Sequence, residues 1–269
     1  MIASRQYFKT VYFIARQSFL NSIAFRAAFF TSFFIELAFI FLSILLWTAI
    51  AQGSDSVGGR SIQELITYMG IARLIVPIDM DFVTQVQQRV LSGEIISDFL
   101  RPVKTSFLYF SQEIGRYLHR LFLHVLPIYT LVYVIVGINL PGDFITFLLF
   151  LISICLSFIL MFYINYLTSL MAFWITQLFS LNVIKGQTVR FLSGYLVPLW
   201  IFPVSFIELL KYLPFASVVF IPIEIYLGKL EAATIAIYLS LQLGWIVVFI
   251  FLSGLVLKRA TKKIAINGG

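Results

Sequence analysis

Charged residues are scarce in this sequence of 269 residues. Asp, Glu, Lys and Arg together make up 12% of the chain, whereas apolar residues make up 61% and Phe alone occurs 29 times. A soluble domain is about half apolar and a quarter charged. The mean hydropathy of +0.99 lies far on the apolar side. The composition therefore excludes a soluble globular protein and indicates an integral membrane protein.

Cysteine and histidine are nearly absent. The single cysteine, Cys155, excludes a disulfide within the chain. The two histidines, His119 and His124, are five residues apart and do not share a face of a regular α-helix. Because a zinc site needs several converging ligands, we expect no metal site.

Catalytic motifs are missing as well. The sequence contains no G-x-S-x-G, no H-E-x-x-H and no cluster of acids, so we expect no catalytic residues and no enzyme activity of the chain itself. It also lacks the phosphate-binding loop G-x-x-x-x-G-K-[ST], since Gly228 and Lys229 are followed by Leu230. We expect this chain to bind no cofactor; if the protein uses ATP, the ATPase is another chain.

What the sequence does have is long apolar stretches. A membrane-spanning helix needs about 20 such residues, and we predict an all-α polytopic fold with six spans, at 27–50, 62–80, 112–138, 144–174, 183–200 and 232–257. Residues 176–190 are polar enough to predict a loop. The segment 201–228 is apolar but contains Pro203, Pro214 and Pro222, which one unbroken helix cannot accommodate. We therefore expect short, broken helices that dip into the outer leaflet.

The N-terminal residues 1–26 are basic and carry no acid. Their apolar and aromatic side chains recur at helical spacing, which is typical of an amphipathic helix on an anionic membrane surface. A cleaved signal peptide is the alternative. The apolar run 27–50 is about as long as a bilayer is thick, which favours a retained first span.

The basic residues predict the orientation. With six spans, 15 of the 19 Lys and Arg residues fall on the side that carries both termini, 3 fall on the other side, and Arg73 lies within a span. Such residues concentrate on the cytoplasmic side of membrane proteins. We expect both termini in the cytoplasm, and we attribute the net charge of +7 to orientation and not to nucleic-acid binding.

Three features inside the membrane region could carry function. Glu36 and Arg73 are costly charges within predicted spans, and we expect them either to form a fixing ion pair or to line a substrate path. Polar residues at 165–169 fit either hydrogen bonding between helices or a substrate-facing stripe. Glu224, just after Pro222, is either a helix-start charge, the interpretation we prefer, or a gate residue.

The interval 82–104 is the longest charged stretch between predicted spans. Its apolar residues recur at helical spacing, Gly93 can end a first short helix after Leu91, and Pro102 stops a second. We predict a bent amphipathic helix pair on the cytoplasmic side. It is either a docking surface for another protein or a helical loop that lies in the membrane interface.

Three segments resemble one family. VLSGEIISDFLRPVKTS from Val90, VGINLPGD from Val136 and YLPFASVVFIPIEIYLGKL from Tyr212 are similar to segments of bacterial type-2 ATP-binding-cassette (ABC) permeases. The resemblance covers the whole chain: a basic start, six spans and a broken segment before the last. It implies a permease of the bacterial cytoplasmic membrane that exports a small or amphiphilic substrate.

The resemblance also implies partners and a site. A separate ATPase would bind ATP and Mg²⁺, and a second permease, identical or related, would complete the transporter within the lipid. The interval 82–104 would be the coupling helix on the ATPase, with motif positions at Gly93, Glu94, Leu100, Arg101 and Pro102. The alternative is a membrane-embedded binding subunit or secondary carrier that needs no such ATPase. Inverted repeats with two matching broken helices would favour it, but only one half of the sequence has such breaks.

Overall fold

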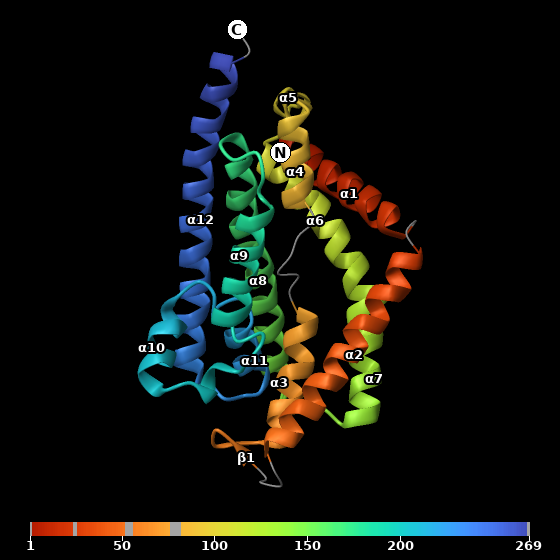
Figure 1. Cartoon of the computed structure of the whole chain (residues 1–269), viewed down its shortest axis with the longest axis vertical. Helices are drawn as coiled ribbons and strands as arrows, with labels where there is room; N and C mark the ends of the chain where they lie inside the picture. Colours follow the sequence, from red (N-terminus) through yellow and green to blue (C-terminus); the bar gives the residue numbers. More distant parts are fainter. Residues whose placement is uncertain (1, 24–25, 52–55, 76–81, 268–269) are drawn as a thin grey trace.

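Almost all of the described chain is helical (Figure 1). The computed structural model describes residues 2–23, 26–51, 56–75 and 82–267. The non-helical parts include an antiparallel hairpin, formed by β1 (Ser56–Val57) and β2 (Arg60–Ser61). The first helices are α1 (Ile2–Ile23), α2 (Arg26–Ala51), α3 (Ile62–Ile75), α4 (Phe82–Leu91), α5 (Ile95–Phe99) and α6 (Thr105–Arg120). A π-helical turn η1 (Leu121–Val125), then α7 (Leu126–Val136), α8 (Phe144–Leu170), α9 (Phe179–Leu192), α10 (Val204–Tyr212), α11 (Phe220–Tyr226) and α12 (Ala232–Asn267) follow. The all-α prediction is confirmed.

Within the described part of the chain, four helical stretches are long and apolar enough to cross a membrane. They are Phe30–Ile50, Thr105–Val136, Phe144–Phe173 and Ala232–Lys262, and they correspond to the first, third, fourth and sixth predicted spans. The other two predicted spans contain α3 and α9, helices of 14 residues each. At about 1.5 Å per residue each is shorter than a hydrocarbon core of about 30 Å. Residues 76–81, at the end of the second predicted span, lie outside the described part of the chain.

The molecule has two distinct ends (Figure 1). One end carries α5, the beginning of α1 and the C-terminal end of α12, and we call it the elbow end. The opposite end carries the β1–β2 hairpin and α10, and we call it the hairpin end. The long helices α8 and α12 run side by side between the two ends, and α1 crosses α6 near the elbow end.

The crossing of α1 and α6 depends on Gly115. A Cβ atom at this position would collide with the backbone carbonyl of Ala15 and would lie 2.9 Å from the Cβ of Ser18. Only glycine therefore allows the two backbones to approach this closely. The predicted N-terminal helix at 1–26 is thus observed as α1, held against the third predicted span.

Buried polar residues join α8 to its neighbours. The amide of Gln242 in α12 donates to Ser153 Oγ (3.0 Å) and to the Ser217 carbonyl (2.8 Å), and Ser157 Oγ donates to that same carbonyl (2.8 Å). All four residues are buried. Such bonds between helices are favoured where no water is available, and they fix the loop before α11 against both long helices.

The residues at 165–169 are buried too. Asn165 accepts a hydrogen bond from Lys185 of α9, and the Tyr166 hydroxyl lies 3.0 Å from Thr105 Oγ1. These contacts agree with the interpretation as hydrogen bonds between helices. The prediction of a loop at 176–190 was wrong, because most of these residues belong to α9. The polar side chain that indicated a loop, Lys185, is directed to a partner inside the bundle.

The proline-rich segment is broken into short elements, as predicted. A 3₁₀ turn (Leu199–Ile201), α10 and α11 follow one another between α9 and α12. Pro203 precedes the first residue of α10, where its missing N–H removes no helical hydrogen bond. Within this segment α11 contacts α3 and α8, so its backbone is covered by protein.

Candidate functional site

The predicted helix pair forms a bent unit at one end of the molecule. We call α4, α5 and the following residues 100–104 the elbow. Helix α4 ends at Leu91, and Gly93 has a left-handed φ of 79°, which a residue with a side chain adopts only with strain. Helix α5 begins two residues later and ends before Pro102. Both predicted breaks are present.

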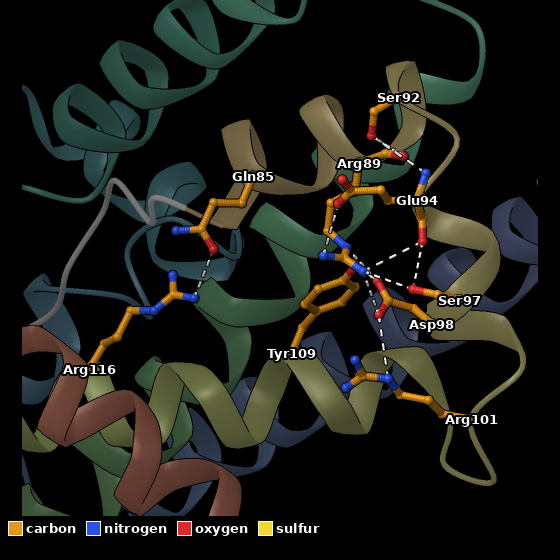
Figure 2. Close-up of polar contacts among 9 residues, drawn as sticks. All are labelled: Gln85, Arg89, Ser92, Glu94, Ser97, Asp98, Arg101, Tyr109 and Arg116. Atoms are coloured by element: carbon orange, nitrogen blue, oxygen red, sulfur yellow. Dashed lines mark hydrogen bonds and ion pairs between the residues drawn. The ribbon is translucent and has the colours of Figure 1, made fainter.

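An ion pair closes the bend (Figure 2). Arg89 of α4 donates from Nε to Asp98 Oδ2 (2.7 Å) and from Nη2 to Asp98 Oδ1 (3.0 Å), and the hydroxyl of Tyr109 in α6 donates to Asp98 Oδ2 (2.7 Å). The Asp98 side chain is only 3% exposed. Two-point contacts between guanidinium and carboxylate are strong and directional. One carboxylate therefore joins three helices.

Weaker contacts surround this pair. Arg89 also donates to Ser97 Oγ (3.1 Å) and to Glu94 Oε2 (3.4 Å), while Arg101 Nε lies 3.8 Å from Asp98 Oδ1. Partial burial lowers the pKa of Arg89, but its hydrogen bond and ion pair with Asp98 outweigh this and raise the pKa above its ordinary value. Arg89 is therefore charged at every physiological pH.

The inner face of the elbow packs on two long helices. The ring of Phe82 stacks on Tyr109 of α6 (6.1 Å between centroids) and lies 5.4 Å from the ring of Phe162 in α8. Arg116 of α6 donates to Gln85 of α4 (3.0 Å), as Figure 2 shows. A displacement of the elbow would therefore displace α6 and α8 with it.

We call the exposed surface of the elbow its outer face, and all five residues that match the family motif contribute to it. Gly93, Glu94, Leu100, Arg101 and Pro102 are each exposed, and Leu100 is 80% exposed. Two further apolar side chains on this surface, Leu91 (55%) and Ile96 (49%), were not singled out from the sequence. Exposed apolar residues rimmed by charges are typical of a surface that binds another protein.

One of the two charges predicted within the membrane, Glu36, has a described partner. Glu36 of α2 accepts a hydrogen bond from Arg120 Nη2 (2.9 Å), at the end of α6. The side chain of Arg73 lies outside the described residues, so its pairing with Glu36 stays a prediction. No sequence pattern indicated Arg120 as the partner of Glu36.

The π-helical turn η1 corrects the expectation for the two histidines. A π-turn closes hydrogen bonds five residues apart, which is the spacing of His119 and His124. Their rings lie 6.4 Å apart, between Phe19 of α1 and Phe33 of α2. Among the described residues, no three His, Cys, Asp or Glu side chains come together as a metal site.

A second cluster lies at the hairpin end, and we call it the hairpin latch. Arg60 of β2 donates to both carboxylate oxygens of Glu224 in α11 (2.6 and 2.7 Å), and its guanidinium lies 4.1 Å from the ring centroid of Trp200. Lys229, after α11, pairs with Glu64 of α3 (2.5 Å). The preferred interpretation of Glu224 as a helix-start charge was wrong, because the residue lies beyond the first turn of α11 and binds Arg60.

The fold and the elbow together define a multi-pass membrane protein that presents a charged, helical projection at one end. The family model for the ABC-2 family transporter protein matches residues 37–268. The chain therefore belongs to this family, whose members are membrane components of transporters and are not catalytic themselves. No curated protein and no solved structure matches the chain.

Proposed function

We propose that this chain is the permease subunit of an ATP-driven exporter of the bacterial cytoplasmic membrane, and that the elbow is the surface that binds its ATPase. The family assignment supports a partner ATPase. The observation that carries the proposal is the elbow itself: all five motif residues are exposed, while other residues of the elbow are bonded to α6 and packed against α8.

The distribution of charge supports a cytoplasmic elbow. Arg89, Arg101 and Lys104 belong to the elbow, and Lys258 and Arg259 lie near the end of α12 at the same end of the molecule (Figure 1). The hairpin end has the three basic residues Arg60, Lys211 and Lys229. This asymmetry fits the preference of Lys and Arg for the cytoplasmic side, although Lys185 and Arg190 now belong to α9 and not to a loop.

The contacts suggest how force would pass into the membrane. ATP and Mg²⁺ bind to the ATPase, whose closure displaces the elbow. The Arg89–Asp98 pair keeps α4 and α5 in a fixed relation, so the displacement is not lost at the bend. Tyr109 and Phe82 then transmit it to α6 and α8. The resulting shift of the spans moves a small or amphiphilic substrate outward.

Co-purification tests this proposal. The tagged chain is extracted from its native membrane in mild detergent, and mass spectrometry identifies retained chains that carry a phosphate-binding loop. We expect an ATPase to be retained by the wild type and lost on Arg101→Glu. The control Arg259→Glu reverses an exposed charge at the same end but outside the elbow, and it should retain the ATPase.

Two outcomes would contradict the proposal. Absence of any ATPase from the wild-type preparation would favour the secondary carrier, and uptake driven by an ion gradient in proteoliposomes of this chain alone would support that alternative directly. Equal loss of the ATPase on Arg101→Glu and Arg259→Glu would show that the elbow is not the specific contact. A second permease chain in the same preparation, identical or related, would complete the proposed assembly.

A further inference from the structure

A cavity of about 220 Å³ lies between α7 and α8, and we call it the lateral pocket. Five aromatic residues line it: Tyr117, Tyr129, Phe147, Phe150 and Tyr226. Helix α3 contacts both α7 and α11, and α11 contacts α8. These contacts leave a space between α7 and α8 that is closed on its inner side by Ile71 of α3 and Tyr226 of α11.

Two of the three tyrosine hydroxyls of the lining are bonded to each other. The hydroxyls of Tyr129 and Tyr226 lie 2.6 Å apart, and Tyr226 donates to the Asn139 carbonyl (2.8 Å). The wall is therefore mostly carbon. An apolar cavity of about 150 Å³ stays free of water and accepts a benzene-sized molecule, so this larger cavity favours an apolar occupant.

The π-helical turn contributes one wall. Leu121 and Val125, the first and last residues of η1, both line the pocket. A π-turn inserts one residue into a helix and displaces its neighbours. Such turns are frequent at functional sites.

The mouth of the pocket opens onto the outer surface of the bundle. Leu126 (46% exposed), Phe147 (39%) and Leu151 (41%) line the pocket and are also exposed. They belong to the stretches Thr105–Val136 and Phe144–Phe173, which are long and apolar enough to cross a membrane. At this depth the surrounding medium is the hydrocarbon of the bilayer, not water.

We propose that the lateral pocket binds one acyl chain of a membrane lipid. Its volume suits part of a chain, and its wall offers carbon and aromatic faces. The bound chain fills the space between α7 and α8 and sets their separation. This inference needs only the membrane location of the chain and does not depend on the identity of its ATPase or substrate.

Photo-labelling tests the proposal. The chain is reconstituted in phosphatidylcholine nanodiscs that contain a lipid with a diazirine midway along one acyl chain, and adducts are mapped by mass spectrometry after illumination. We expect adducts to concentrate on the lining residues, several-fold above those on Val247 and Phe251 of α12, which are each 64% exposed but do not line the lateral pocket. A lipid with the diazirine on its headgroup should give no such concentration.

A matched pair of variants locates the occupant. Ile154→Trp fills the pocket, because Ile154 lines it, whereas Ile152→Trp places the same ring on the exposed side of the same helix. The first should reduce the adducts several-fold and the second should not. Equal labelling of pocket and α12, or no reduction in Ile154→Trp, would overturn the proposal. If Ile154→Trp does not fold, the wild-type adduct map alone decides.

Discussion

Arg89 and Asp98 lie on opposite sides of the bend in the elbow, and two hydrogen bonds of 2.7 and 3.0 Å join them. The pair is nine residues apart in sequence, and the turn at Gly93 brings its members together. Because Asp98 also accepts from Tyr109, its carboxylate is one of the points at which the elbow is attached to α6.

Removal of the carboxylate should loosen the elbow. Removing one partner of a buried ion pair lowers the free energy of unfolding by roughly 3–5 kcal/mol. Because Arg89 is partly exposed, we expect a loss near the lower end of this range for Asp98→Ala. Hydrogen exchange should become faster in α4 and α5 while that of α12 stays unchanged. Glu94→Ala is the control, because this acid is 63% exposed and pairs at 3.4 Å. Unchanged exchange in Asp98→Ala would contradict the assigned attachment.

The bend itself depends on the backbone of Gly93. A residue with a Cβ atom in the left-handed region costs roughly 1–2 kcal/mol, and no neighbouring atom lies near the position of such a Cβ atom. Gly93→Ala should therefore reduce ATPase-coupled transport through backbone strain alone. Gly142→Ala, which also meets no neighbouring atom but has no positive φ, should have little effect on transport. Equal transport by both variants would contradict this role.

The close crossing of α1 and α6 predicts opposite effects for two helical glycines. Replacing glycine by alanine inside a helix stabilises it by about 1 kcal/mol, and Gly254→Ala should do so because its Cβ atom meets no neighbour. Gly115→Ala should instead lower the melting temperature, since the new methyl group collides with Ala15. Thermal unfolding in detergent distinguishes them. A raised melting temperature for Gly115→Ala would contradict the packing.

The two pairs of the hairpin latch should differ in strength. Glu224 is only 4% exposed, so Glu224→Gln leaves the Arg60 guanidinium without its charge partner, at a cost of roughly 3 kcal/mol. The pair of Lys229 with Glu64 is more exposed, and Glu64→Gln should cost less than about 1 kcal/mol. Thermal unfolding measures both. A larger decrease in stability for Glu64→Gln than for Glu224→Gln would show that burial does not determine how much each pair contributes.

The sequence predicted local features better than contacts between distant residues. Apolar runs identify four spans because a long helix in lipid needs a continuous apolar stretch. Gly93 and Pro102 were recognised because glycine and proline restrict the backbone locally. The Arg89–Asp98–Tyr109 contacts were missed, since no helical spacing relates residues across a turn.

Two errors share one physical cause, which is that tertiary contacts override local patterns. The sequence around Lys185 predicted a loop, but this lysine belongs to α9 and donates to Asn165. The sequence around Glu224 predicted a charge at the start of a helix, but Glu224 binds Arg60, which lies 164 residues away in sequence. The approach of the two histidines depends on a π-turn, and the periodicity of an α-helix does not predict one.

The central claim is that the outer face of the elbow binds an ATPase, and a photo-cross-linking amino acid at Leu100 tests it most directly. Leu100 is 80% exposed on the elbow, whereas Val134, 73% exposed near the hairpin end of α7, serves as the control position. Illumination of whole cells should join position 100, and not position 134, to a chain with a phosphate-binding loop. Cross-links from position 100 to lipid alone, or none to an ATPase, would contradict the account.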